Sequence, residues 1–256
     1  MKMPTVKSKA KTEIKPVEKS GESASAISKE LKSLGSASYA TLMKRHGIRE
    51  PIFGVKISEL KKIQKRVKRD YQLALDLYDT GIYDAMYLAG LIADDMRMTK
   101  ADLQRWADGA YCTAIGNHAV AWVAAEGRHG YELALKWIES KKAPIAAAGW
   151  STLSGLVALR DDAEWDADVL KTLLQRVQTS IHEQPDDVRY AMNNFVISLG
   201  SYVKALTPDA IRTAKAIGVV TVDMGDTECK VPSAADYIKK VQERGAVGKK
   251  RKTVKC

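Results

Sequence analysis

The chain has 256 residues, of which 45% are hydrophobic and 28% charged, an ordinary balance for a globular protein with a sizeable core. It has no apolar run long enough to span a bilayer, and its lysine-rich start lacks the apolar stretch of a secretory signal, so we expect a cytoplasmic protein with no membrane partner. The three cysteines are far apart and no histidine lies near them at zinc-ligand spacing, which argues against a disulfide framework and against a metal site.

The formal net charge of +10 is concentrated at the two ends of the chain. Residues 1–20 carry six lysines and two glutamates, and residues 244–256 carry six cations and no acid, so the residues between them sum to zero. Basic tails add affinity for phosphates through the release of counterions, but they also serve solubility alone. The tails by themselves leave both interpretations open.

The first clear element along the chain is a basic amphipathic helix. Residues 1–23, rich in Lys, Ser, Pro and Glu, are typical of a disordered arm. In residues 57–71, apolar residues recur every three or four positions, which predicts a helix whose charged side chains face away from the core. The apolar stripe consists of Ile57, Leu60, Ile63, Val67 and Tyr71.

The helical pattern continues to residue 218 with only brief connections. Thr99 and Asp102 are spaced as a capping box, and Pro144 and Pro208 stand where proline opens helices. Short helices in succession predict an all-α fold, a HEAT-like α-solenoid of stacked helix pairs, with a compact helical bundle as the alternative. The predicted helices cover residues 70–79, 82–94, 99–106, 111–126, 129–140, 144–159, 164–182, 185–202 and 207–218.

The pattern changes after Gly218. β-Branched residues flank a turn-like Met-Gly-Asp, which predicts a small β-hairpin formed by Val219–Asp223 and Thr227–Val231. A short helix over Ser233–Glu243 follows, and the glycine- and lysine-rich end is expected to be flexible. The expected organisation is a disordered basic arm (1–23), a helical domain (24–218), a hairpin–helix appendage (219–244) and a basic tail (245–256).

Three stretches carry a resemblance to a known family. They are Phe53–Ile63 (FGVKISELKKI), Leu103–Asp108 (LQRWAD) and Ala134–Ile138 (ALKWI). Their order resembles that of the DNA alkylation repair family, the AlkD-like HEAT-repeat DNA glycosylases, over about residues 30–215. The resemblance implies a C-shaped solenoid that binds duplex DNA in its concave groove and releases N3- or N7-alkylated purines without a metal or organic cofactor.

The resemblance also implies catalytic roles for Trp106 and Asp108. Alkylation leaves the base cationic, so a tryptophan face attracts it, and a carboxylate can stabilise the oxocarbenium-like sugar. In the family's pattern an Asp follows the Trp by four positions, and that position holds Ala110 here. A core role for Trp106 and a solvated helix end for Asp108 therefore remain open, and a catalytically degenerate DNA-binding protein or protein-interaction scaffold is the alternative function.

Residues 56–69 hold seven cations and one acid, and together with the basic tails they favour a polyanion as the partner. The predicted partner is double-stranded, damaged DNA, bound by a monomer in the cytoplasm, or at the nucleoid if the source is bacterial. The predicted DNA-binding residues are Lys56, Lys61, Lys62, Lys65, Arg66, Lys68 and Arg69 in the helix, and Lys249, Lys250, Arg251 and Lys252 in the tail.

Overall fold

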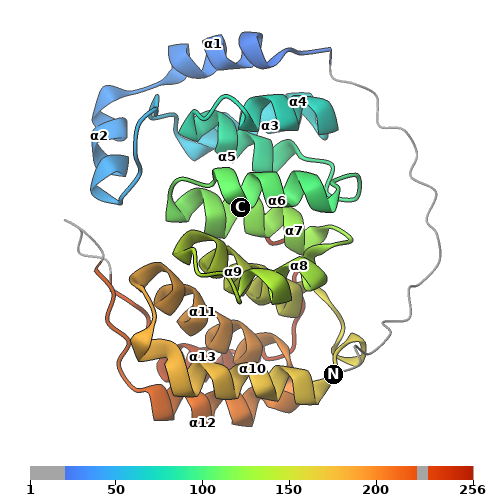
Figure 1. The fold of residues 1–256 in the computed structure, drawn as a ribbon, viewed down its shortest axis with the longest axis vertical. Helices are drawn as coiled ribbons and strands as arrows, with labels where there is room; N and C mark the ends of the chain where they lie inside the picture. The colour runs from blue at the N-terminus through green and yellow to red at the C-terminus, as the bar shows by residue number, and fades with distance from the viewer. Residues whose placement is uncertain (1–20, 224–229, 256) are drawn as a thin grey trace.

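The computed structural model describes residues 21–223 and 230–255, and within them the regular structure is entirely helical. The helices stack one above another from α1 at one end to α12 and α13 at the other (Figure 1). The all-α prediction is therefore confirmed for the described residues. The helices are α1 Ala24–Leu34, α2 Ala37–Arg45, α3 Ile57–Val67, α4 Tyr71–Tyr78, α5 Tyr83–Ile92, α6 Lys100–Gly109, α7 Ala121–Glu126, α8 Gly130–Trp137, α9 Ala143–Leu159, α10 Ala167–Ser180, α11 Asp186–Tyr202, α12 Thr207–Ile217 and α13 Ala234–Glu243.

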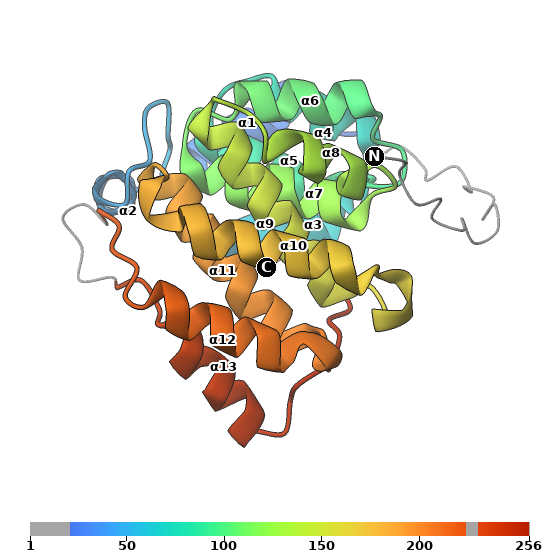
Figure 2. The same cartoon turned by 60° about the horizontal axis from the view of Figure 1, so that its bottom comes forward.

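The helices form two layers, as in a solenoid of helical repeats. Helices α4, α6, α8, α10 and α12 lie in one layer, and α5, α7, α9, α11 and α13 lie in the other (Figure 1, Figure 2). The second layer is continuous, because α9 packs against α7 on one side and α11 on the other, and α11 packs against α13. Helix α9 is apolar on almost every side because it lies between neighbours in its own layer and is also covered by α8.

Most predicted helix boundaries lie within a few residues of the observed ones, but the basic helix ends earlier than expected. It stops at Val67 because Lys68 takes a φ of 63°, which the regular helix does not allow. Asp70 then caps the next helix by accepting a hydrogen bond from the Leu73 N–H at 3.1 Å. The predicted capping box of Thr99 and Asp102 is present at the start of α6.

The predicted β-hairpin is wrong. Residues 219–223 and 230–231 form no strand in the described part of the chain, and the remainder of the predicted hairpin, residues 224–229, lies outside it. Residues 219–223 instead run against the start of α11, where Arg189 donates to the Thr221 carbonyl at 2.7 Å and the Asp223 N–H donates to Asp186 at 2.9 Å. Val220 is buried and Val222 partly buried, whereas Val219 and Thr221 are exposed. The backbone of the segment hydrogen-bonds to side chains of α11 instead of to a second strand.

The end of the chain, expected to be flexible, is docked along the solenoid. We call residues 246–255 the C-terminal strap. After α13, Gly245 and Gly248 adopt φ angles of +60° and +78°, which favour glycine and turn the chain back towards the other helices (Figure 2). The strap then follows the C-terminal ends of α11, α9 and α7 to reach the residues just beyond α5.

Candidate nucleic-acid groove

A groove of about 1270 Å³ crosses the layer that contains α9, α11 and α13. Its floor comes from these helices, from α7 and from the π-helical segment η1 (Ile115–Val120) that precedes α7. The C-terminal end of α2 and the C-terminal strap also contribute to its lining. A surface assembled from successive helices of one layer is long enough to receive an extended ligand.

The floor of the groove combines small, polar, apolar and aromatic side chains and is mostly uncharged. Helix α9 contributes Ser151, Ser154, Gly155 and Ala158, and helix α11 contributes residues three, four or seven positions apart, which keeps each set on one face of its helix. The small side chains allow a ligand to approach the helices closely. The α11 residues of the floor are Asp187, Tyr190, Asn194, Ile197, Ser198, Ser201 and Tyr202.

Cations line the groove from two separate segments. Lys44 and Arg45 come from the end of α2, and Lys249 and Arg251 come from the C-terminal strap. Lys44 is paired with Glu50, while the two strap residues form no ion pair within the described part of the chain. Phosphates of a nucleic acid are the natural partners of such cations.

Aromatic rings lie where η1 meets the groove. His118 lies 5.1 Å from Trp122 between ring centroids, and Tyr87 meets Trp122 edge to face at 5.4 Å. Solvent reaches His118, but the surrounding protein lowers the pKa of its imidazole by desolvation, which favours the neutral ring. A π-helical segment at this point is consistent with a functional surface, because such segments recur at functional sites.

Trp106 lies in the core. Its side chain is fully buried and stacks on Tyr78 with ring centroids 4.2 Å apart and planes 7° from parallel. The Tyr78 hydroxyl donates to the carbonyl of Trp106 at 2.6 Å. In this arrangement the ring faces other side chains and does not line the groove.

Asp108 lies on the other layer of the solenoid, at the end of α6. Its carboxylate accepts a hydrogen bond from Gln104 at 3.3 Å and lies 3.8 Å from the Lys142 ammonium. It is not among the groove residues, and Ala110, which occupies the family's aspartate position, is buried. The catalytic role of Trp106 and Asp108 remains a prediction, and the structure does not bring the two side chains together in the groove.

The basic helix α3 presents its charges to solvent, as the sequence predicts. Leu60, Ile63 and Val67 are buried, whereas the seven cations of residues 56–69 are exposed. They do not line the groove. Arg66 differs from the others because it binds both Glu22 and Glu30, at 2.7 and 2.6 Å.

The tail residues divide into two groups. Lys249, Arg251 and Lys252 are exposed, and the first two line the groove. Lys250 points inward, where it pairs with Asp162 at 2.8 Å. The Lys250 ammonium, which is predicted from the sequence to contact a phosphate, is therefore engaged by the protein itself.

Sequence reasoning missed Lys44, Arg45 and the serine-rich floor. The floor has a signal, because Ser151, Ser154 and Ala158 recur at helical spacing in an otherwise apolar segment. Two adjacent asparagines of α11 have different surroundings. Asn194 lines the groove, whereas the buried Asn193 donates to the Pro232 carbonyl at 2.9 Å.

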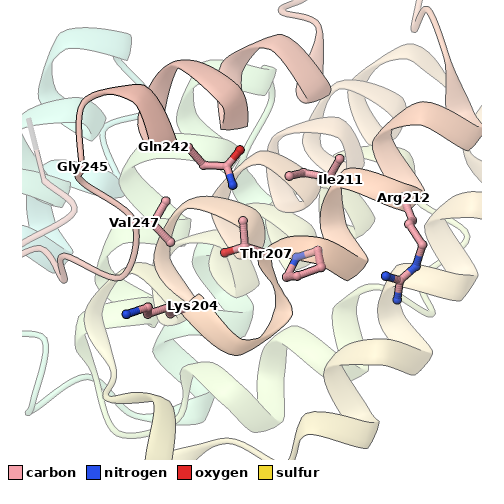
Figure 3. Close-up of a pocket in the computed structure, with 8 residues that line it drawn as sticks. Lys204, Thr207, Ile211, Arg212, Gln242, Gly245 and Val247 are labelled. Carbon is pink, nitrogen blue, oxygen red and sulfur yellow. The ribbon is translucent and has the colours of Figure 1, made fainter.

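A second hollow of about 800 Å³ lies at the other side of the strap's origin (Figure 3). Thr207 and Ile211 of α12 face Gln242 of α13 across it, and Gly245 and Val247 of the turn into the strap close one side. This hollow separates α12 from the turn. Its lining residues include no aromatic side chain and no carboxylate.

The stacked helix pairs and the cation-lined groove define a HEAT-like protein suited to an extended anionic ligand. The chain matches the family of DNA alkylation repair enzymes over residues 27–221, and it belongs to this family. The predicted family is thereby confirmed, and the solved structure described in the next paragraph confirms the HEAT-like fold. No helix in the described residues is long and apolar enough to cross a membrane.

Relatives extend this assignment along most of the chain. The uncharacterized protein Lin0241 of Listeria innocua is 30% identical over 221 residues, which cover 84% of this chain and 95% of that protein. The uncharacterized protein Lmo0209 of Listeria monocytogenes is 30% identical over 220 residues, with the same coverage. A solved structure is described as a new family of proteins related to the HEAT-like repeat DNA glycosylases with affinity for branched DNA structures. It is 34% identical, with a TM-score of 0.85, and the match covers 92% of this chain and all of that one.

Proposed function

We propose that this protein binds branched DNA in the groove and holds it by its phosphates. The observation that carries the proposal is the groove itself, in which cations from α2 and from the C-terminal strap accompany a mostly uncharged floor with small side chains. Cations that contact phosphates hold the DNA backbone without reading its sequence. The affinity for branched DNA described for the similar solved structure supports this choice of ligand.

The test is a binding titration of the purified protein against a labelled four-way junction, a linear duplex of the same arm sequence and a single strand. We expect the junction to bind most tightly. If roughly four phosphates are neutralised, affinity should fall about 100-fold between ~50 and ~200 mM salt. Equal binding of all three ligands, or a junction affinity that is independent of salt, would contradict the proposal.

Release of alkylated purines is the second candidate function, because the chain belongs to the DNA alkylation repair family. The test is incubation with DNA that contains 7-methylguanine, followed by chromatography of the free bases. We expect junction binding without base release, since Trp106 stacks in the core and Asp108 lies outside the groove lining. If base is released, Asp108→Asn shows whether this carboxylate is the source.

A further inference from the structure

The C-terminal strap carries two groups of cations. Lys250 and Lys255 point into the protein, whereas Lys249 and Arg251 are exposed. We propose that it is a fixed DNA-binding element in which Lys250 and Lys255 anchor the segment while Lys249 and Arg251 present their charges to DNA in the groove. The inference rests on the proposed function and adds to it the division of roles along the strap. It assigns Lys250 and Lys255 as positioning residues, not phosphate contacts.

Lys250 is a saturated anchor. Its ammonium donates to the Tyr202 carbonyl at 2.7 Å and to the Val157 carbonyl at 2.9 Å, and it pairs with Asp162 at 2.8 Å. An ammonium has three protons to donate, so these three partners occupy it fully. The two carbonyls belong to the last turns of α9 and α11, where helix dipoles favour a cation.

Lys255 is a second anchor, at the far end of the strap. It pairs with Asp95 at 2.7 Å, and the two side chains are only 9% and 5% exposed. The neighbouring Val254 is buried, and its N–H donates to Glu126 at 2.8 Å. Because both charges are buried, the loss of either one leaves the other without its partner, which is strongly unfavourable.

The exposed cations on either side of the first anchor, Lys250, line the groove. The Arg251 N–H donates to the Ala158 carbonyl at 2.8 Å, so the backbone is held while the guanidinium remains exposed. Lys249 and Arg251 flank Lys250 and both line the groove, as expected where neighbouring side chains of an extended segment point in opposite directions. Neither forms an ion pair with any residue that the structure describes.

The test compares three variants of the full-length protein in junction binding. Lys249→Ala/Arg251→Ala removes the exposed charges, and Lys250→Met removes an anchor. Lys215→Ala/Lys240→Ala removes two exposed charges from α12 and α13 outside the groove lining and is the matched control. Hydrogen exchange of residues 246–255 reports whether the strap stays docked.

We expect Lys249→Ala/Arg251→Ala to weaken junction binding and to reduce the slope of log affinity against log salt by about two, with strap protection unchanged. Lys250→Met should lose both strap protection and affinity, and the control should keep both. Unchanged affinity and slope in Lys249→Ala/Arg251→Ala would overturn the inference. Tighter junction binding by Lys250→Met would also overturn it, because the strap would then cover the groove instead of binding DNA. If the wild-type protein binds no DNA, the proposed function fails; if it binds and only the strap variants fail to respond, the inference alone fails.

Discussion

Trp106 illustrates how a residue can carry a family resemblance and still serve the core. Its ring is stacked on Tyr78, and burial raises the pKa of the Tyr78 hydroxyl far above its usual range, so this phenol stays protonated and keeps its hydrogen bond to the Trp106 carbonyl. The pair joins α4 to α6. Trp106 thus contributes to the packing between these two helices.

Replacement of Trp106 by alanine should therefore lower stability more than it affects DNA binding. A buried tryptophan truncated to alanine costs about 3–5 kcal/mol, and Trp106→Phe should cost less because an aromatic stack on Tyr78 is kept. The measurement is urea unfolding, together with junction binding under conditions where the variant is still folded. Full stability combined with lost binding in Trp106→Ala would indicate a direct DNA contact.

Asp95 predicts a pH dependence. Burial raises the pKa of its carboxyl to about 6, although Lys255 acts in the opposite direction. Because the folded protein binds this proton more tightly than the unfolded chain, the carboxyl's contribution to stability declines as pH rises from about 4 to about 6. Relative to Asp95→Asn, the wild-type free energy of unfolding should therefore fall over this range and level off above it. A difference that instead grows in favour of the wild type would mean that the Lys255 ion pair dominates.

Helix α3 shows what an amphipathic pattern determines and where local strain intervenes. Its buried stripe and exposed lysines follow from the spacing of the apolar residues. The break after Val67 does not, because Lys68 takes a positive φ that favours glycine. The break places Asp70 where it caps α4 and its N–H donates to the Ile92 carbonyl at the end of α5.

The strained backbone at Lys68 predicts that a glycine at this position stabilises the protein. Lys68→Gly should raise the free energy of unfolding by about 1 kcal/mol, because an unfavourable backbone conformation of this kind costs ~1–3 kcal/mol and glycine loses part of the gain to chain entropy. Lys68→Ala is the control, since it removes the same charge and keeps the strain. Equal stability of the glycine and alanine variants, measured by thermal or urea unfolding, would show that the backbone at this position is unstrained.

At the scale of the whole molecule, the groove exists because helices far apart in the chain share one layer. Ser154 of α9 and Asn194 of α11 lie on the same floor, while Lys44 comes from the opposite end of the chain from Arg251. The electrostatic character of this surface is a joint property of these segments. A substitution that places a negative charge on the floor of the groove therefore tests the role of this surface best.

Ser154→Glu should weaken junction binding strongly, because it puts a carboxylate where phosphates or bases approach. Gln175→Glu adds the same charge to the exposed face of α10, outside the groove lining, and should change binding little. Both variants are compared by junction titration at the same salt concentration, with thermal unfolding as the check on folding. Equal effects of the two substitutions would show only a net-charge effect and would remove the groove from the binding model.

The sequence by itself determined the helices, their capping signals, the basic face of α3 and the family, because helical periodicity and short motifs depend on residues a few positions apart. It did not determine the course of residues 219–223, whose backbone is satisfied by Arg189 and Asp186 of α11, or the docking of the C-terminal strap. Lys250 binds carbonyls 48 and 93 positions away, and no local pattern encodes such partners. Only the tertiary structure brings the ends of α9 and α11 together, and that meeting decides which tail cations face inward as anchors and which remain available to DNA.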